Sequence, residues 1–531
     1  MSTAETLPYA ASSEREVNPW LIAVVVSLAA FMEVLDTSIA NVALPHIAGG
    51  LGASNDESTW VLTSYLVSNA IILPMSGWFV GVLGRKKFFM ICIVVFTASS
   101  LFCGIAPTLG ILLLSRVLQG MGGGGLQPMA QAILADSFPP EKRGVAFSVY
   151  GITAIVAPAV GPTLGGWITD SYSWRWIFYI NLPVGILALF LVYRLIEDPS
   201  YITLNKGRSL RVDYIGFGLL AVGVAALQIM LDKGQEDDWF GSHFIVSLAI
   251  VAAVCLITLV IYEWFHKEPL VDVRLFKHGN FAVANLIMFT VGAILFASTV
   301  LLPQFLQTLM GYTAEKAGLV LSVGAIVLLM ELPFVGQLTT KVSARYLIAF
   351  GWLLLALAMY YSTKRLDLQM SFWAAARLRI FQYAPLGFIF IPTNTAAYVG
   401  VPGEKNNAVA GLINFMRNIG SSVGTSMVTT IVARRSQLHQ VRLGSHLSPG
   451  NAGLQAAVSG LANQLMKAGL GAYEAQRQAL GRFYAQLQAQ ATTLSYIDAF
   501  WVLAIAAGLM FFLSFLLKKN DPRKGGRIAM E

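Results

Sequence analysis

The stretch WLIAVVVSLAAFMEVLDTSIAN (20–41) decides the fold. It is long enough to cross the roughly 30 Å hydrocarbon core of a bilayer as a helix. It holds acidic residues and has no A-x-A-like exit, so it indicates a retained span rather than a cleaved signal peptide. Similar runs recur along the chain. Hydrophobic residues make up 56% and charged residues 12%, whereas soluble domains carry roughly 25% charged residues. The composition therefore predicts a polytopic membrane protein and excludes a soluble one.

Basic residues are restricted to alternate connections between the apolar runs. Arg85-Lys86-Lys87 and Lys142-Arg143 follow this pattern, whereas residues 42–58 contain no Lys or Arg and 232–243 is acidic. Because positive loops stay inside, both termini are expected in the cytoplasm of a bacterial inner-membrane protein. The net charge of +8 then reflects these loops and the tail rather than nucleic-acid binding. Windows of about nineteen residues predict fourteen spans, at 20–41, 59–80, 88–106, 109–133, 145–168, 177–195, 213–231, 244–264, 281–302, 317–336, 346–362, 373–398, 408–432 and 499–517.

A weak internal repeat suggests how the spans are grouped. GWFVGVLGRKK (77–87) follows the second span and GQLTTKVSARY (336–346) follows the tenth. If these segments are equivalent, an all-α chain consists of six spans, two extra spans and six more, and transporters built from such halves bind their substrates between them. The expected division is a cytoplasmic N-terminus (1–19), a six-helix bundle (20–195), two additional spans with linkers (196–265), spans nine to thirteen (266–433), a periplasmic helical loop (434–496), the last span (497–518) and a basic cytoplasmic tail (519–531). Lys206, Arg208 and Arg211 precede the seventh span and are expected on the same side as the tail.

The loop 434–496 differs in kind from the spans. It is rich in Ala and Gln, has apolar residues at helical spacing, and contains Gly469 and Gly471, which are expected to divide it into two amphipathic helices. A solvated hairpin and a docking surface for a partner both fit this pattern.

Ionisable side chains inside spans are the best candidates for function, since each costs roughly 2.5–3.5 kcal/mol on insertion scales. Glu33 and Asp36 are three residues apart and share a helix face. Two such carboxylates cannot both ionise easily in a low-dielectric cavity, so one is expected to exchange protons. The alternative is that the pair serves only packing or hydrogen bonds between helices. Arg116 in LLLSRVLQGMGGGG (112–125) needs a carboxylate partner, which a span 1 acid can supply. Such a pair either responds to protonation or is purely structural.

Small and cyclic residues mark two further spans. Residues 120–125 match G-x-G-x-x-G, but no strand precedes them, so helix packing explains them better than a dinucleotide. In IVAPAVGPTLGGW (155–167), Pro158 and Pro162 remove backbone donors. The nearby glycines allow close helix contact and suggest a gating helix; they are Gly161, Gly165 and Gly166.

The second half carries its own ionisable residues. Glu331 lies in span 10, where the insertion cost favours a cavity-facing position. Arg377 and Arg379 point about 200° apart, so they cannot both face one cavity, and at least one is expected to extend to the interface. Arg417 lies in span 13. Neither a metal-ligand cluster nor a nucleophile–base pair nor a phosphate loop occurs in the sequence, which argues against an enzyme.

At these residues the chain resembles the major facilitator superfamily, in particular its fourteen-span drug:proton antiporters of the EmrB/QacA type, and the EmrB branch most. The stretches that carry the resemblance are VLDTSIANVALP (34–45), GPTLGG (161–166), SWRWIFYINLPVG (173–185) and LINFMRNIGSSVGTS (412–426). It implies export of amphipathic drug-like compounds in exchange for protons by alternating access, driven by the proton gradient without a cofactor. Gram-negative relatives of the EmrB branch work with a periplasmic adaptor and an outer-membrane channel, and the resemblance implies that this chain can have the same partners.

Individual positions carry over from the resemblance. Asp36 matches the family's span 1 acid, Arg116 its span 4 arginine, and Gly77, Gly84 and Arg85 its loop motif. The chain departs from the family at Gly81, where Asp is frequent, and at Gln382, where many relatives have Arg. The expected substrate-cavity residues are Glu331, Arg379, Gln382, Asn414 and Arg417.

Two other functions remain open from the sequence. A facilitator or symporter for a small organic nutrient shares the fold, and a membrane enzyme would require an interfacial constellation that the sequence lacks. Three intramembrane acids favour cationic substrates, whereas four arginines at membrane depth favour anionic ones.

Overall fold

The computed structural model describes residues 18–199, 213–445 and 451–518. Within these residues every regular element is a helix. The N-terminal residues 1–17, the basic segment with Lys206, Arg208 and Arg211, and the tail 519–531 lie outside the described residues.

The first half comprises six helical rods, of which the fifth and sixth are interrupted. A π-helical segment (Ile152–Val156) divides the fifth rod just before Pro158, as is common where a helix carries a local distortion with a functional role. The rods are α1 (Pro19–Leu51), α2 (Asn55–Leu83), α3 (Arg85–Ile105), α4 (Leu109–Ser137), α5 with α6 (Arg143–Gly151 and Ala157–Ser171) and α7 with α8 (Trp176–Tyr179 and Asn181–Leu195).

Two additional helices follow, and then the second half. The additional pair is α9 (Tyr214–Lys233) and α10 (His243–Phe265). The second half consists of α11 (Gly279–Thr308), α12 (Ala314–Leu338), α13 (Ala344–Arg365), α14 (Phe372–Ala397), α15 (Asn406–Ser445) and α17 (Ala472–Leu513), with the short α16 (Ala452–Lys467) between the last two.

Twelve helical segments of the described residues are long and apolar enough to cross a membrane. The exceptions among the long rods are α14 and α15, whose hydropathy is lowered by polar and charged side chains. Both pack inside the second half, α14 against α12 and α13, and α15 against α11 and α17. With these two, the described residues contain the predicted fourteen rods arranged as six, two and six.

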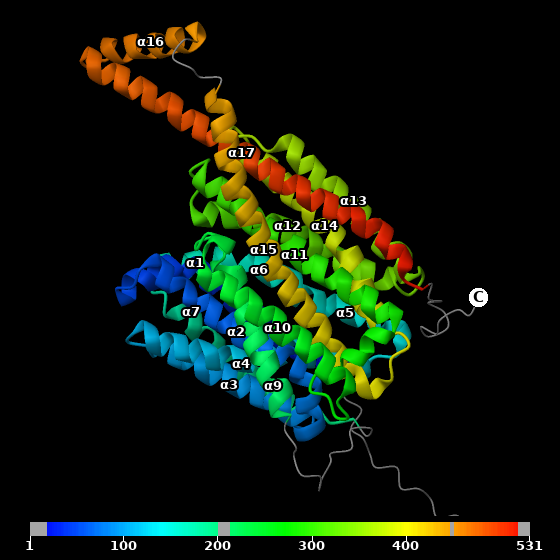
Figure 1. Cartoon of the computed structure of the whole chain (residues 1–531). Coiled ribbons are helices and arrows are strands. Elements are labelled where there is room, and N and C mark those ends of the chain that lie inside the picture. The colour runs from blue at the N-terminus through cyan, green and yellow to red at the C-terminus, as the bar shows by residue number, and fades with distance from the viewer. Residues whose placement is uncertain (1–17, 200–212, 446–450, 519–531) are drawn as a thin grey trace, which may run out of the picture.

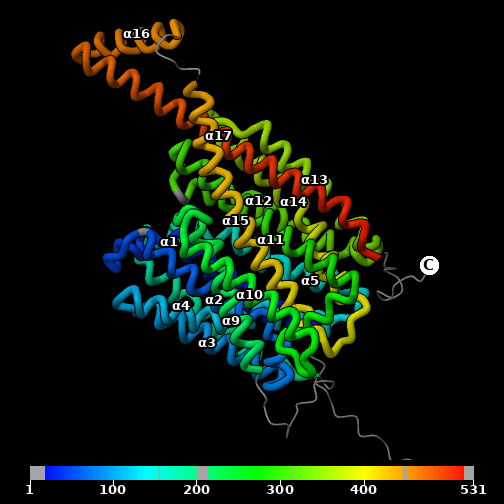
Figure 2. Tube along the Cα trace, viewed as in Figure 1, coloured from blue at the N-terminus to red at the C-terminus, as the bar shows by residue number. Residues whose placement is uncertain are grey.

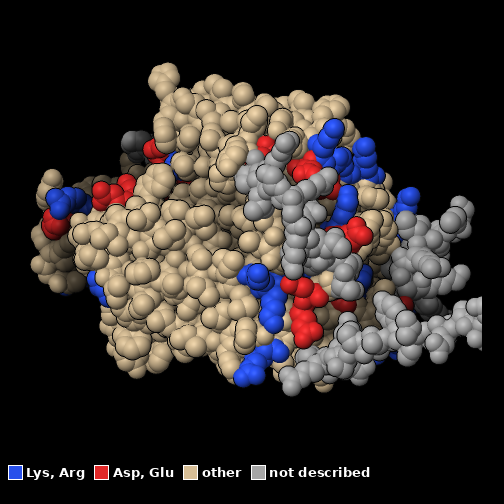
Figure 3. Space-filling view, turned by 90° about the horizontal axis from the view of Figure 1, so that it is seen from below, with Lys and Arg blue, Asp and Glu red and all other residues tan. Residues whose placement is uncertain are grey.

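The two halves meet along two seams (Figures 1 and 2). On one side α2 contacts α15, and α9 contacts both of them; on the other side α5 and α6 contact α12. Charged side chains gather at the two ends of the molecule and leave an uncharged surface between them (Figure 3). Large apolar side chains of the spans are exposed, among them Phe190, Ile257 and Phe512, as expected where lipid is the solvent.

The segment 434–496, called the extension below, is not a separate loop. α15 continues without a break to Ser445, and α17 is continuous from Ala472 to Leu513. Both helices continue across the predicted boundaries at 433/434 and 496/497. A helix of 40 or 42 residues spans about 60 Å, twice the bilayer core, so these boundaries stay predictions of where each helix leaves the membrane. The predicted division at Gly469 and Gly471 is confirmed, since α16 ends just before and α17 begins just after them. Figure 1 shows the extension projecting from the bundle.

Candidate functional site

A cavity of about 860 Å³ lies between the two halves. It is lined from α1, α2, α4, α6, α9, α11, α12 and α15, and it runs from Glu33 and Asn414 at mid-helix to His46 and Asp170 at the helix ends. The side chains of His46 and Asp170 are 47% and 65% exposed. The cavity therefore opens at the end from which the extension projects, called the open end below.

At the opposite end the halves are in close contact. Gly77 of α2 lies against Ala408 of α15, where a Cβ would come within 3.0 Å of the Ala408 Cα. Asn406 donates a hydrogen bond to Asp136 of α4 (2.6 Å), and Asp136 is paired with Arg85 (2.5 Å). Gly84, between α2 and α3, has a φ of 83°, which a residue with a side chain rarely adopts. The predicted loop motif thus lies at the closed end, and Asp136 provides there the carboxylate that Gly81 lacks.

A second polar contact at the closed end involves the connections outside the spans. Asp272 accepts hydrogen bonds from Lys405 Nζ (2.7 Å) and Arg274 Nε (3.2 Å). Burial raises the pKa of Asp272, but the two cations and their hydrogen bonds outweigh it and hold the pKa below its usual value. This ionised carboxylate ties the segment before α11 to the segment before α15.

Asp36 and Arg116 form a buried ion pair in the first half. Arg116 Nη1 lies 2.6 Å from Asp36 Oδ2, and both side chains are at most 1% exposed. Asp36 Oδ1 also accepts hydrogen bonds from Gln119 (3.0 Å) and Asn181 (2.6 Å). The Arg116 guanidinium lies over the Tyr65 ring at 4.3 Å, a favourable cation–π geometry. The partner predicted for Arg116 is confirmed, although neither member of the pair lines the cavity.

Glu33 occupies a different environment from Asp36, although the two share a helix. It lines the cavity and accepts hydrogen bonds from Tyr65 (3.0 Å), Asn69 (3.0 Å) and Gln127 (2.5 Å). Gln127 in turn accepts a short hydrogen bond from Arg417 of the second half. Tyr65 therefore contacts both acid sites, and Gln127 connects Glu33 to the opposite half.

Of the five predicted cavity residues, the structure brings two to the lining, Asn414 and Arg417. Asn414 donates a hydrogen bond to Gln131 of α4 (2.7 Å), and Arg417 donates one to Gln127 of the same helix. Both residues connect the halves at the deepest part of the cavity.

The cavity position predicted for the other three residues is wrong. Arg379 and Gln382 are at most 1% exposed and lie behind the wall, where they are hydrogen-bonded to neutral side chains of α11, α13 and α14. Glu331 lies on the far side of α12, where its Oε1 sits against Gly387 of α14 without a hydrogen-bond partner among the described residues. Its neighbours Met330 and Phe334 are exposed on the outer surface, so insertion cost did not determine its orientation. Arg377 is exposed, as the 200° separation from Arg379 requires.

The proline- and glycine-rich helix α6 packs along α1. Ser38 of α1 donates a hydrogen bond to the Pro158 carbonyl (2.9 Å). This carbonyl has no partner within α6, because Pro162, four residues later, has no backbone N–H. A Cβ at Gly161 would overlap Ser38, and one at Gly165 would lie 3.1 Å from Ile39. Pro162 and Gly166 face the cavity. The glycines at 120–125 likewise pack α4 against α2 and α3, which confirms the packing interpretation.

Several polar residues around the site were not predicted. Asn181 and Ser100 lie beside Asp36 and its hydrogen-bond partner Gln119, Gln127 connects the halves, and Asp136 occupies the closed end. Gln119, Gln127 and Gln131 are separated by eight and four residues in α4. That spacing places them on one face of a helix and could have revealed them. No group of three or more potential metal ligands occurs among the described residues.

These features define a multi-pass membrane transporter whose two halves enclose a cavity open at one end. Residues 26–425 match the family described as Major Facilitator Superfamily. The chain is 37% identical to the multidrug export protein EmrB of Escherichia coli K12, covering 93% of this chain and 94% of that protein. It is 39% identical to EmrB of Haemophilus influenzae, covering 81% and 84%. A solved structure of the proton:xylose symporter XylE aligns over 96% of this chain and 97% of that chain, with a TM-score of 0.58 at 14% identity.

The chain belongs to the major facilitator superfamily. It is a transporter, not an enzyme, and the fold and family predicted from the sequence are confirmed.

Proposed function

We propose that this protein exports amphipathic toxic compounds, including antibiotics, across the bacterial inner membrane in exchange for protons. The observation that carries the proposal is the buried Asp36–Arg116 pair, which Tyr65 connects to Glu33 on the cavity wall. Protonation of either carboxylate changes the charge next to the cavity, and a change in charge is what can couple proton movement to a change between two conformations. The multidrug export relatives support the same activity.

The remaining features fit alternating access. The cavity is open at one end while Gly77, Asp136 and Asn406 close the other. If basic loops and both termini are cytoplasmic, the open end faces the periplasm and the structure is the state that releases substrate. The cycle then needs no cofactor, since the proton gradient drives it.

Reconstituted protein tests the exchange directly. Proteoliposomes loaded with an amphipathic dye and a pH-sensitive probe are given a proton gradient, and the two fluxes are recorded together. We expect dye and protons to move in opposite directions, a protonophore to stop the dye flux, and Asp36→Asn to lose the coupling. Dye and proton movement in the same direction, or dye movement indifferent to the gradient, would establish a symporter or facilitator instead.

We further propose that the extension contacts a periplasmic adaptor that leads to an outer-membrane channel. Its support is geometric, because α15 and α17 both run well beyond the bilayer and α16 has mostly exposed side chains around a small apolar contact with α17. Site-specific crosslinking from exposed Tyr473 should trap a periplasmic protein in a Gram-negative host. The cavity-facing residue Thr425 is the control position, and equal yields from both positions would contradict the docking.

A further inference from the structure

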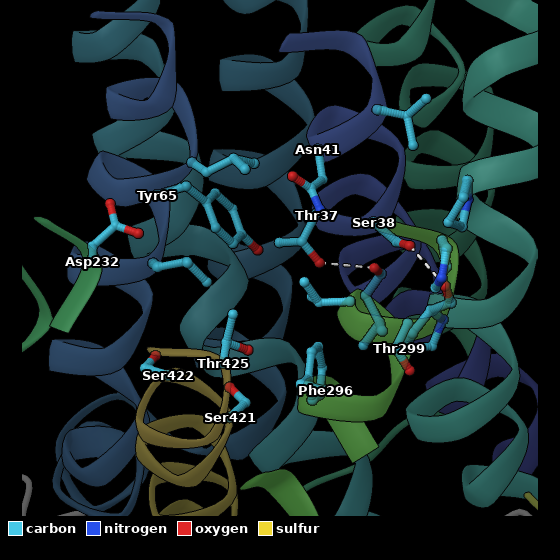
Figure 4. A pocket seen from close by; sticks show the side chains of 18 of the residues that line it. Thr37, Ser38, Asn41, Tyr65, Asp232, Phe296, Thr299, Ser421, Ser422 and Thr425 are labelled. Atoms are coloured by element: carbon cyan, nitrogen blue, oxygen red, sulfur yellow. Dashed lines mark hydrogen bonds between the residues drawn. The ribbon is translucent and has the colours of Figure 1, made fainter. Parts of the chain in front are cut away.

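The additional helix α9 forms part of the cavity wall. Gln228, Leu231 and Asp232 of α9 line the cavity, and their spacing places them on one face of the helix; Gln235 and Glu236 of the turn that follows line it too. Figure 4 shows Asp232 beside the same space as Tyr65 and Thr37 of the first half and Ser421, Ser422 and Thr425 of the second. The polar face of this helix is thus directed at the transport pathway rather than at lipid.

α9 is hydrogen-bonded to both halves at the seam between α2 and α15. Asp232 accepts a short hydrogen bond from Thr63 of α2, and Lys233 donates to Thr59 of α2 (2.8 Å). Gln228 donates to Ser422 of α15 (2.6 Å). The helix is therefore fixed in the wall, which gives its polar side chains a defined position.

Four carboxylates line the cavity, and three of them face a basic group. Glu236 lies 2.6 Å from Lys233, and Asp170 lies 3.6 Å from His46. Glu33 is connected to Arg417 through Gln127. Within the described residues, the remaining carboxylate, Asp232, forms no ion pair, and its hydrogen bond comes from the neutral Thr63 hydroxyl. The adjacent Lys233 is the nearest cation in the chain, but its ammonium is hydrogen-bonded to Glu236 and Thr59 instead.

A second, independent feature lies one turn away on the same face. Gln228 is only 2% exposed, and its Oε1 has no hydrogen-bond partner among the described residues. A buried acceptor without a donor costs free energy. Residues four apart on a helix have Cβ atoms about 5–6 Å apart, so one ligand nitrogen can reach both side chains. A carboxylate without an ion pair beside an unsatisfied amide oxygen favours a ligand that is both cationic and a hydrogen-bond donor.

We propose that Asp232 and Gln228 bind the protonated amine of a cationic amphiphile, which names the substrate class of the export activity proposed above and rests on it. The ammonium donates to Asp232 and to Gln228 Oε1. The apolar part of the ligand lies against the cavity's aromatic and aliphatic lining, which includes Tyr65, Phe296 and Leu231. The additional pair of helices thus contributes to substrate selection as well as connecting the halves.

The test compares three ligands that share one apolar group: 4-phenylbutylamine, 4-phenylbutanol and 4-phenylbutyrate. Their affinities for the purified, detergent-solubilised full chain are measured by calorimetry. We expect the amine to bind most tightly to the unsubstituted protein. Asp232→Asn should weaken amine binding at least tenfold and leave the alcohol unchanged, and Gln228→Leu should weaken amine binding about threefold.

The matched control is Asp237→Asn, which removes the same charge from an exposed residue nearby that does not line the cavity. Equal amine affinity for the unsubstituted protein and Asp232→Asn overturns the proposal, as does an equal loss in Asp237→Asn or tighter binding of the carboxylate ligand. Proton exchange in proteoliposomes separates this result from the proposed function. If exchange persists in a protein whose amine binding ignores Asp232, the amine site alone is refuted; if no ligand exchanges with protons, the export activity is refuted whatever the calorimetry shows.

Discussion

Each half contains a buried arginine that is hydrogen-bonded to a glutamine. Among the described residues, the arginine of the first half also pairs with a carboxylate, whereas the arginine of the second half does not. In α4, Arg116 donates to Gln119 (2.7 Å), and Gln119 donates to Ser100 of α3 (2.6 Å). In α14, Arg379 donates to Gln382 (3.1 Å), and Gln382 donates to Ser362 of α13 (3.0 Å). Each guanidinium also lies over a tyrosine ring, at 4.3 and 4.0 Å.

The difference lies in the first helix of each half. α1 presents Asp36 to Arg116, whereas α11 presents the hydroxyls of Ser298 and Thr299 to Arg379 (3.1 and 2.5 Å). Arg379 has no acidic partner among the described residues. A hydroxyl keeps the same charge at every physiological pH, whereas a carboxylate can be neutralised. The first half can therefore respond to protons at this position, and the second half holds a permanent cation in the same framework.

The largest expected effect is on stability when the arginines are removed. Arg116→Gln leaves Asp36 buried without its cation, which costs about 3–5 kcal/mol. Arg379→Gln removes a charge that has no counter-ion, so its lost hydrogen bonds are largely offset and the cost is about 1 kcal/mol. Thermal unfolding of the two detergent-solubilised variants should show the larger decrease for Arg116→Gln. An equal or reversed order would mean that the two clusters are energetically equivalent.

The second expected effect is on transport. Asp36→Asn keeps the shape of the side chain but removes the titratable group, so dye export driven by a proton gradient should fall at least tenfold, about 1.4 kcal/mol in activation free energy. The matched change in the second half, Ser298→Ala, removes one neutral hydrogen bond and should leave more than half of the export rate. Export measured in everted vesicles compares them. If Asp36→Asn retains gradient-driven export, the carboxylate that couples export to protons is Glu33 rather than Asp36.

The sequence predicted the fold because membrane spans depend on a one-dimensional property. Apolar runs located all fourteen rods, and the cost of burying Arg116 required a carboxylate such as Asp36. The direction in which a side chain points was harder to predict from the sequence. In a chain that is apolar on every face, hydropathy does not distinguish cavity from lipid, so Glu331 was assigned to the wrong side of α12. The continuity of α15 and α17 was missed because hydropathy falls where a helix leaves the bilayer, although helix propensity does not.

Polar residues without charge were the other omission. Gln127 and Asn181 organise the two acid sites, yet an isolated amide in a span has no sequence signal that separates it from a packing residue. Asp232 was counted only as part of an acidic loop, because its position on the inner face of α9 depends on contacts with α2 and α15.

A third change tests whether the missing carboxylate alone distinguishes the halves. Ser298→Asp places an acid where Ser298 Oγ now accepts from Arg379 Nη1 at 3.1 Å. A hydrogen bond to a charged group contributes about 1.5–3 kcal/mol, and part of that gain is lost in burying the new carboxylate. We expect an increase in apparent unfolding temperature that disappears in the double variant with Arg379→Gln. A decrease that persists in the double variant would show that the site cannot accommodate the side chain.

The smallest expected difference concerns the serines behind the two glutamines. Ser100→Ala and Ser362→Ala each remove one acceptor from a glutamine amide, a loss of about 0.5–1.5 kcal/mol. Ser100 also accepts a hydrogen bond from Asn181 (3.1 Å), which holds Asp36 at 2.6 Å. Ser100→Ala should therefore shift the pH dependence of export as well as stability, whereas Ser362→Ala should change stability alone. Export rates recorded across a pH series separate the two outcomes, and an equal shift in both variants would argue against a coupling role confined to the first half.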